Sequence, residues 1–300
     1  MAAIITLTTD FGQGDVYVAV MKGVILNTNP QANIIDINHS IEPQDILQCA
    51  FILNIAYRYF PQQTIHVAIV DPGVGSERLG IIVKTPSAFF IAPDNGILSY
   101  VIDELCPGVV NAGQREESLQ KNGFRVAVKE GLEIAAITDP RFWRHPVNPT
   151  FHGRDIFAPV AAGLSLGISL YEFGEKITSL FVLPIPKPYS DSQGSLIGQV
   201  LYIDHFGSLT TNIKSSDLLP PSGTEHPIIQ VIQEKPSGSS VTIEIAGRLI
   251  HGLHSYYAQG EGLMAIIGSS GYLEVSLKNG NARDFLGVGI GEEVKVMPSL

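Results

Sequence analysis

Short apolar runs alternate with longer amphipathic segments over the first 70 residues. The short runs are rich in β-branched side chains and predict buried strands at Ile4–Thr9, Asn33–Ile37 and Ile65–Val70. Between them, apolar residues at helical spacing predict helices over Val16–Leu26, with Asp15 as a candidate N-cap, and over Pro43–Tyr59, with Asp45 in its first turn. Strands that alternate with helices at this spacing pair in parallel, which predicts an α/β fold.

The pattern changes further along the chain. Leu79–Lys84 and Ala88–Ala92 predict a hairpin added to the sheet, and the Ala-rich segment Phe157–Leu166 predicts another helix. A Pro-, Ser- and Gly-rich stretch over 183–194 predicts a linker. Beyond it, short β-like runs separated by Gly predict strands at Ile197–Ile203, Ile228–Ile232, Val241–Ile245, Leu263–Ile267, Tyr272–Ser276 and Glu293–Val296, with an exposed loop at Ser215–Glu225. We therefore expect a Rossmann-like α/β N-terminal domain (1–182) and an all-β barrel C-terminal domain (195–300).

Composition narrows the class of partner. Hydrophobic residues make up 45% of the chain and charged residues only 16%, which fits either a large core or a weakly charged subunit interface. The formal net charge of −10 argues against nucleic acid and anionic membranes, since both need clustered Lys and Arg. Neither a secretory signal nor an apolar stretch of membrane-spanning length is visible, so we expect a soluble cytoplasmic protein.

Metal and nucleotide signatures are missing from the sequence. Cys49 and Cys106 form no CxxC pair, and His251 and His254 lack a third ligand nearby, so surface histidines are the simpler interpretation. The sequence also contains no GxGxxG, GxxxxGK[ST], HExxH or GxSxG motif. We expect no metal site and no cofactor.

Several polar motifs stand where a site of an α/β sheet would lie. Asp10 and Asp71 each follow a predicted strand, and ligands bind outside the carboxyl ends of such strands. Asp71 also opens a Gly/Pro turn that ends at Arg78, and taken alone a structural Asp–Arg ion pair is the simpler interpretation of that turn. His152 lies beside Asp155, a second candidate N-cap, and a lone histidine is more often structural than catalytic.

Taken together, the motifs resemble the S-adenosyl-L-methionine (SAM) hydroxide adenosyltransferase family, whose relatives include the SAM-dependent fluorinase and chlorinase. The resemblance extends from about Ile4 to Glu293. It rests on Thr8–Gly12, Asp15–Val18, Met21–Gly23, Asp36–Ile41, Asp71–Arg78, Pro93–Gly96, Thr150–Pro159, Ile203–Gly207, Thr211–Asn212 and Gly268–Glu274. Each motif is weak singly, and their joint order is specific.

The resemblance implies a mechanism and a set of site residues. Members combine an α/β domain with a β-barrel domain, assemble as trimers, and bind SAM between one subunit's N-terminal domain and its neighbour's C-terminal domain. The catalytic set of the hydrolytic members falls on Asp71, Arg78 and His152. The implied substrate-binding residues are Asp10 for the ribose, Asp204 for the methionine ammonium, Ser269 and Ser270 for its carboxylate, and Asn212 and Glu274 within the matched motifs.

Departures from the halogenases favour water as the nucleophile. Halogenases carry Tyr where this chain has Asp71 and a halide-binding Ser where it has Gly153, and these two differences favour water. They also carry Arg in place of Ser270 and Asn in place of Ser208, which leaves the carboxylate and adenine contacts open. We expect hydrolysis of SAM to adenosine and L-methionine by attack at C5′. The alternatives are a SAM-dependent halogenase, a SAM- or adenosine-binding module without turnover, and a structural trimer.

The residue types suit this reaction. The sulfonium leaves as a neutral thioether and needs no general acid, so the site has to position and activate one water. Arg78 is a permanent cation that can orient developing hydroxide, and Asp71 would hold Arg78 by a charge-assisted pair. His152 can accept or relay a proton near neutral pH. Which of His152 and Asp71 takes the proton stays open from sequence.

Overall fold

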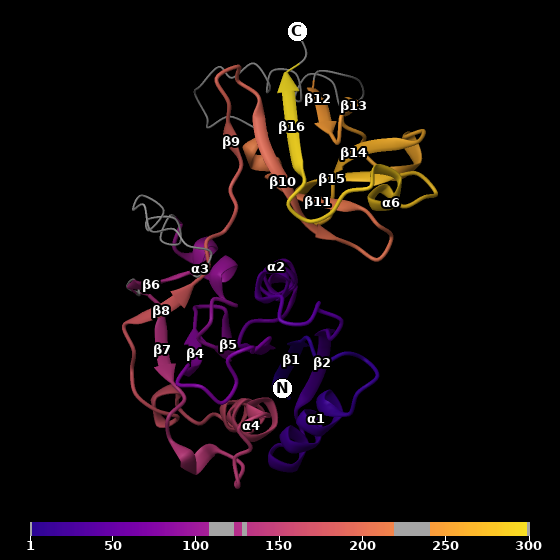
Figure 1. Cartoon of the computed structure of the whole chain (residues 1–300). Coiled ribbons are helices and arrows are strands. Elements are labelled where there is room, and N and C mark those ends of the chain that lie inside the picture. Colours follow the sequence, from indigo (N-terminus) through magenta and orange to yellow (C-terminus); the bar gives the residue numbers. More distant parts are fainter. Residues whose placement is uncertain (1, 108–122, 128–130, 219–240, 299–300) are drawn as a thin grey trace. The chain divides into compact units, whose positions relative to one another are not determined.

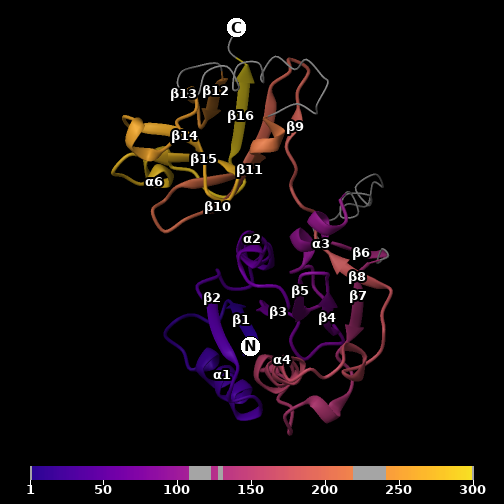
Figure 2. The same cartoon turned by 180° about the vertical axis from the view of Figure 1, so that it is seen from behind.

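The computed structural model describes residues 2–107, 123–127, 131–218 and 241–298. These residues fall into an N-terminal unit, Met1–Ile185, and a C-terminal unit, Pro186–Leu300. Figures 1 and 2 show the elements of each unit from opposite sides. Within the described residues, every helix is too short or too polar to cross a membrane.

A six-stranded mixed sheet with the strand order β2-β1-β3-β5-β4-β7 forms the centre of the N-terminal unit. Its strands are β1 (Ile4–Thr9), β2 (Asn33–Asn38), β3 (Thr64–Ile69), β4 (Gly80–Lys84), β5 (Ala88–Pro93) and β7 (Glu133–Ala136). β1 pairs in parallel with β2 and β3, and β3 pairs in parallel with β5. β4 pairs antiparallel with β5, so the predicted hairpin is confirmed. A separate two-stranded sheet joins β6 (Phe124–Ala127) to β8 (Ser179–Val182).

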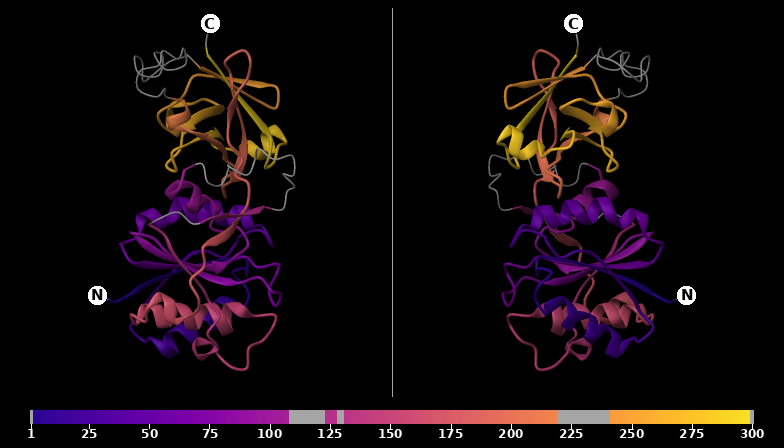
Figure 3. Two further views of the ribbon diagram at one scale, coloured as in Figure 1. Left: turned by 90° about the vertical axis from the view of Figure 1, so that its left-hand side faces the viewer. Right: turned by 90° about the vertical axis from the view of Figure 1, so that its right-hand side faces the viewer.

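Helices cover both faces of this sheet (Figure 3). They are α1 (Tyr17–Thr28), α2 (Ile46–Ala56), α3 (Ser99–Leu105) and α4 (Ala158–Ser165). α1 and α4 pack together on one face, and α2 and α3 pack together on the other. This three-layer arrangement is the α/β fold that the sequence pattern predicts.

The helix starts differ from the predicted ones. Val16 occupies the N-cap position of α1 without a side-chain hydrogen bond, so the assignment of Asp15 as N-cap is wrong. Asp45 is itself the N-cap of α2, because its Oδ1 accepts a hydrogen bond from the backbone N–H of Gln48 at 2.8 Å. The predicted helix over Pro43–Tyr59 is therefore shorter at both ends, and a 3₁₀ turn at Tyr57–Tyr59 follows it.

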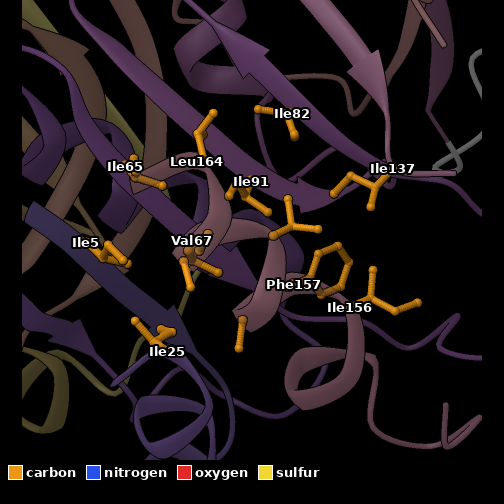
Figure 4. Packing of buried hydrophobic residues seen from close by; sticks show 14 of the residues in the cluster. Ile5, Ile25, Ile65, Val67, Ile82, Ile91, Ile137, Ile156, Phe157 and Leu164 are labelled. Atoms are coloured by element: carbon orange, nitrogen blue, oxygen red, sulfur yellow. The ribbon is translucent and has the colours of Figure 1, made fainter. Parts of the chain in front are cut away.

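The core of the N-terminal unit lies between the sheet and the α1/α4 layer. Figure 4 shows Ile5 and Val67 from neighbouring strands facing Phe157 and Leu164 from the α4 side. Phe157 is fully buried. A large apolar side chain buried in this way contributes about 1.5–3 kcal/mol. The packing fixes β1, β3 and the segment before α4 relative to one another.

The C-terminal unit is an antiparallel, nearly closed barrel-like sheet. Its path is β13-β12-β16-β10-β11-β15-β14, with β9 paired to β10. The strands are β9 (Tyr189–Ser190), β10 (Leu196–Ile203), β11 (Leu209–Lys214), β12 (Val241–Ile245), β13 (Arg248–His251), β14 (Leu263–Ile267), β15 (Tyr272–Leu277) and β16 (Glu293–Pro298). A bridge between His254 and Ile266 brings the chain after β13 against β14, which narrows the opening. A short helix, α6 (Ala282–Leu286), follows β15.

Two segments predicted for this unit lie partly or wholly outside the described residues. The strand predicted at Ile228–Ile232 lies outside the described residues. The loop predicted at Ser215–Glu225 begins instead as a 3₁₀ turn over Ser215–Asp217, and its residues beyond 218 also lie outside them.

Candidate active site

Asp71 and Arg78 form an ion pair across the turn that follows β3. Nε of Arg78 donates to Oδ1 of Asp71 at 2.8 Å, and Nη2 of Arg78 donates to Oδ2. Only 6% of the Asp71 side chain and 12% of the Arg78 side chain are exposed. A bidentate, largely buried pair fixes the plane of the guanidinium. Arg78 is therefore held in one orientation before any ligand binds.

Gly75 allows this turn to approach the loop that carries His152. Its φ is +80°, and a Cβ at this position would lie 2.6 Å from the carbonyl oxygen of Pro149. Glycine is the residue that adopts such a φ without steric cost, and it is also the only one without a Cβ. The close approach of the two segments therefore depends on Gly75.

His152 joins the pair from this second loop. Its Nδ1 lies 3.0 Å from Nη2 of Arg78. Because a guanidinium only donates, Nδ1 is the acceptor and the neutral ring carries its proton on Nε2. Burial, followed by the positive charge of Arg78, lowers the pKa of His152 below its usual value. His152 immediately precedes a π-helical turn, Gly153–Phe157, which leads into α4; such turns are frequent at functional sites.

A cavity of about 320 Å³ opens beside these residues. Asp71 and His152 line it together with Asp10, which follows β1. Oδ2 of Asp10 accepts a hydrogen bond from the backbone N–H of Gln44 at 2.9 Å. The structure thus brings Asp10, Asp71, Arg78 and His152 into one site, as the strand-end argument and the family resemblance predict.

Aromatic side chains form an apolar wall of this cavity. Phe11 and Phe151 both line it, with ring centroids 5.8 Å apart in an edge arrangement. Tyr17 packs against both rings at 5.9 and 5.2 Å. Edge-to-face contacts of this kind restrain the rings, so the wall has a defined shape.

Asp155 has a role that differs from the expected N-cap. Phe157 holds the N-cap position of α4, and the Asp155 side chain is completely buried. Oδ1 and Oδ2 of Asp155 accept hydrogen bonds from Arg154, both at 2.7 Å, and Arg144 donates to Oδ1 at 3.2 Å. Oδ2 also accepts the backbone N–H of Asn148 at 2.9 Å. Asp155 therefore ties the His152 loop to the start of α4.

The other predicted substrate-binding residues lie in the C-terminal unit. Oδ1 of Asp204 accepts backbone N–H bonds from Phe206 at 2.9 Å and Ser208 at 2.8 Å, which shapes the turn between β10 and β11. Asp204 and Ser208 line a second cavity, within this unit. The structure therefore brings Asp204 to a concave surface.

The side chain of Asn212 forms hydrogen bonds within the C-terminal unit. Its Oδ1 accepts the backbone N–H of Gln199 at 2.8 Å, and its Nδ2 donates to the carbonyl oxygen of Pro186 at 3.2 Å. The side chain is 5% exposed. These contacts join β10, β11 and the start of the unit, so they define a structural role for Asn212.

Ser269 and Ser270 occupy the tight turn between β14 and β15. The turn is closed by a hydrogen bond from the N–H of Gly271 to the carbonyl oxygen of Gly268 at 2.9 Å. Glu274, on β15, lies directly behind it, since a Cβ on Gly268 would approach its Oε2 to 2.7 Å. The structure therefore places these three polar residues around one turn.

Metal-ligating groups do not cluster in the part of the chain that the structure describes. No three His, Cys, Asp or Glu side chains come close enough there to hold an ion. His251 is exposed, as the sequence predicts. His254 is partly exposed and lies where the chain bridges to β14.

Some contributors to the two cavities carry no sequence signal. The backbone N–H of Gln44 donates to Asp10. Gln44 has a φ of +67°, a conformation that its residue type does not predict. Tyr257 and Ser276 line the cavity of the C-terminal unit through pairings between distant segments. Only the three-dimensional fold reveals these positions.

Comparison with known protein families gives matches over both units. The N-terminal domain of SAM hydroxide adenosyltransferase matches residues 5–174, and the C-terminal domain of the same family matches residues 198–295.

Individual relatives agree with this match. The chain is 32% identical to the (R)-S-adenosyl-L-methionine hydrolase of Methanocaldococcus jannaschii, over 98% of this chain and 95% of that protein. A fluorinase of an Actinoplanes species is 27% identical, over 72% of this chain and 73% of that protein. The crystal structure of an uncharacterized conserved protein from Thermotoga maritima superposes with a TM-score of 0.79 and 30% identity, covering 97% of this chain and 99% of that one. The chain belongs to the SAM hydroxide adenosyltransferase family.

Proposed function

We propose that this protein hydrolyses SAM to adenosine and L-methionine. The observation that carries the proposal is the Asp71–Arg78–His152 set at a cavity that also holds Asp10. Water attacks C5′, the C5′–S bond breaks, its electron pair stays on sulfur, and the water loses one proton. Turnover in ¹⁸O-water tests this, because the label should appear in the 5′-hydroxyl of adenosine and not in methionine. Adenosine without the label would overturn the proposal.

We propose a different task for each member of the set. Arg78 is a fixed cation that stabilises hydroxide as it develops. The Nε2–H tautomer makes His152 a second donor to that oxygen. Asp71 keeps carboxylate lone pairs beyond those that Arg78 engages. We therefore assign the transient proton to Asp71 and not to His152, whose acceptor nitrogen is occupied.

Asp10 serves the substrate in this scheme. A carboxylate accepts hydrogen bonds from two neighbouring hydroxyl groups, which fits the ribose diol of SAM. The backbone N–H of Gln44 fixes one of its oxygens before the substrate arrives. Such pre-organisation reduces the entropy lost on binding.

The stereochemistry at sulfur refines the proposed substrate. The Methanocaldococcus relative is named for the (R) epimer of SAM. We propose the same preference here. Incubation of each purified epimer with the enzyme, followed by adenosine quantification, measures it; a faster reaction of the (S) epimer would contradict it.

The halogenase alternative has its own readout. Asp71 and Gly153 replace the Tyr and the halide-binding Ser of halogenases, and the fluorinase match covers less of the chain than the hydrolase match. Incubation with SAM and chloride or fluoride should give no 5′-halo-5′-deoxyadenosine. A binding module without turnover would retain SAM and release no adenosine even at high protein concentration.

We further propose a cytoplasmic homotrimer whose sites combine Asp10, Asp71, Arg78 and His152 of one subunit with Asp204, Ser269, Ser270 and Glu274 of a neighbour. The family resemblance supports this arrangement, and the free thiols of Cys49 and Cys106 fit a reducing compartment. Sedimentation equilibrium should give a trimer. A monomer that turns over SAM would refute the shared site.

A further inference from the structure

Thr9, the last residue of β1, supports the turn that carries Asp10. The residue is fully buried. Oγ1 of Thr9 accepts the backbone N–H of Phe11 at 3.2 Å, and this short turn spans Asp10. The N–H of Phe11 belongs to the peptide group that joins it to Asp10. The hydrogen bond therefore restrains the backbone from which the Asp10 carboxylate reaches the cavity of the candidate active site.

His39, which follows β2, contacts the same hydroxyl group from the neighbouring strand. Nδ1 of His39 lies 2.8 Å from Oγ1 of Thr9, and His39 is only 4% exposed. Nε2 of His39 lies 3.0 Å from Oδ1 of Asp36 on β2. The carbonyl oxygen of His39 also accepts the backbone N–H of Gly12 at 2.8 Å. His39 therefore holds the turn on both sides of Asp10, once through its side chain and once through its backbone.

The neighbours of His39 determine where its proton lies. A carboxylate only accepts, so the nitrogen that faces Asp36 carries the proton, since a lone pair there would meet another lone pair at 3.0 Å. This contact lacks the alignment of a hydrogen bond, and its attraction is that of an N–H dipole for a carboxylate. The neutral ring then has its lone pair on Nδ1, where it accepts the hydroxyl proton of Thr9. An imidazolium would donate from Nδ1 instead, and the Thr9 proton would have no acceptor among the contacts of that hydroxyl in the described residues.

A hydroxyl, an imidazole and a carboxylate in this order also form the nucleophilic triad of many hydrolases. A nucleophile has to reach its substrate, and Thr9 has no exposed surface. Its oxygen instead accepts a backbone N–H of the turn. The arrangement therefore suits the positioning of the turn and does not suit attack by Thr9.

We infer that His39 is a positioning residue that acts through Thr9 and holds Asp10 in the orientation that accepts the sugar hydroxyl groups of the substrate. The inference rests on the proposed function, in which Asp10 serves the ribose. Gln44 supplies the complementary restraint, because its backbone N–H donates to Oδ2 of Asp10. The segment between β2 and α2 thus holds both the backbone and the carboxylate of Asp10.

Asparagine and glutamine at position 39 separate the Thr9 contact from the rest of the side chain. Oδ1 of asparagine is bonded to Cγ, as Nδ1 of histidine is, so His39→Asn retains an acceptor for the Thr9 hydroxyl. The amide of glutamine lies one carbon further out, so His39→Gln resembles Nε2, reaches toward Asp36 and lacks that acceptor. Both variants keep the backbone hydrogen bond to Gly12.

Calorimetric binding of adenosine and 2′-deoxyadenosine measures recognition of the ribose without turnover. The parent should bind adenosine at least about tenfold more tightly, because its 2′-hydroxyl donates to a charged acceptor. His39→Gln should reduce this preference to within about threefold, and His39→Asn should retain it. In turnover of SAM, His39→Gln should raise KM about tenfold and leave kcat within about threefold, because the ribose is held equally in the ground and transition states.

Thr6 and His66 provide a matched control on the same strand. Oγ1 of Thr6 lies 2.8 Å from Nδ1 of His66, and both residues are buried, but Thr6 lies three residues before Thr9 on β1. Thr9→Val should abolish the nucleoside preference, as the glutamine variant does. Thr6→Val removes an equivalent buried hydroxyl and should leave the preference unchanged. A loss of preference in Thr6→Val would show that general loosening of β1 is responsible and would overturn the inference.

The outcomes also separate this inference from the proposed function. If SAM is hydrolysed but His39→Gln keeps the nucleoside preference of the parent, the inference fails and the function stands. If the preference depends on His39 but SAM is not hydrolysed, the function fails and the positioning role stands. Equal loss of the preference in His39→Asn and His39→Gln overturns the role of the Nδ1 acceptor. A parent that binds both nucleosides equally overturns the inference as well.

Discussion

Nη2 of Arg78 lies 3.0 Å from Nδ1 of His152, and this contact determines the tautomer of the imidazole. A guanidinium has no lone pair to offer, so Nδ1 must be unprotonated for the contact to be a hydrogen bond. Protonation of the ring would instead place two cations at this distance. In the proposed reaction the site therefore works with a neutral His152, and the lowered pKa of His152 favours that state.

The acidic limb of the pH–rate profile should report this residue. The pKa of His152 is lowered from its usual 6.5, chiefly by burial and then by Arg78, so the ring is neutral above that lowered value. We expect kcat to be flat near pH 7 and to fall as the pH drops through a value below 6.5.

Neighbouring charges should move this limb in opposite directions. The charge of Arg78 lowers the pKa of His152 and that of Asp71 raises it. Arg78→Gln should shift the limb to higher pH, and Asp71→Asn should shift it to lower pH. Single-turnover rates from pH 4.5 to 8 measure both shifts. A limb that stays in place in both variants would show that another group controls it.

Substitutions in the site should separate catalysis from binding. His152→Ala, Arg78→Ala and Asp71→Ala each remove a group that we propose acts on the water, so kcat should fall by about 10²–10⁴-fold with little change in the Kd for SAM. Asp10→Ala should mainly raise Kd, because the ribose is held equally in the ground and transition states. Single-turnover kinetics with calorimetric binding distinguishes the two classes.

The three catalytic substitutions should also be non-additive. Arg78 contacts both Asp71 and His152, so its removal already disorganises the set. The double variant Arg78→Ala/His152→Ala should be little slower than the worse single variant. Catalytic-set variants that lose SAM affinity but turn over bound SAM at the parent rate would show that these residues bind substrate instead.

Gly75→Ala should damage both stability and activity. The new methyl group would lie 2.6 Å from the Pro149 carbonyl oxygen on a backbone with φ of +80°, so the two loops must separate, at a cost of about 2 kcal/mol. The separation also pulls Arg78 from His152, and kcat should fall at least about tenfold. Gly23→Ala is the control: a Cβ there meets nothing within 4 Å, and in helix α1 it should stabilise by about 0.5–1 kcal/mol. Urea unfolding and kcat of both variants measure the contrast; equal stability of the two would contradict the argument.

The sequence predictions are accurate where an element is determined by its own residues, and they fail where contacts with distant segments determine it. β1 and β3 are predicted to within one residue because their β-branched runs carry the signal themselves. β11 is not predicted, because the polar residues Thr210, Thr211 and Asn212 are typical of a loop. In the structure all three are buried in the barrel. α3 escapes because its seven residues are too few to show a helical period.

The same distinction applies to the site. Strand ends and family motifs were enough to nominate Asp10, Asp71, Arg78 and His152, which the fold brings together. They were not enough to give the tautomer of His152, since that depends on which nitrogen meets Arg78. Asp155 was open to an N-cap assignment because Asp is common there. The three donors around its carboxylate come from residues that only the folded loop assembles.

Asp155→Asn should reveal how much the site depends on that buried carboxylate. The substitution removes a fully buried negative charge from between Arg144 and Arg154 and places an amide donor against donors, which should cost about 3 kcal/mol of unfolding free energy at pH 7. Burial alone would raise the pKa of Asp155, but hydrogen bonds from Arg154, the Asn148 backbone and Arg144 lower it overall. A carboxyl with a lowered folded-state pKa stabilises the protein fully above its unfolded value of 3.8 and loses that contribution as the pH falls through the folded value. The stability gap between parent and variant should therefore be constant from pH 7 to 5 and should narrow below pH 4.

Asp139→Asn is the matched control, because the Asp139–Arg141 pair is at the surface and its Arg141 side chain is 76% exposed. Urea unfolding at several pH values measures both variants. A gap that widens in acid, or an Asp139→Asn variant as unstable as Asp155→Asn, would show that the buried ion pair is not what anchors the His152 loop.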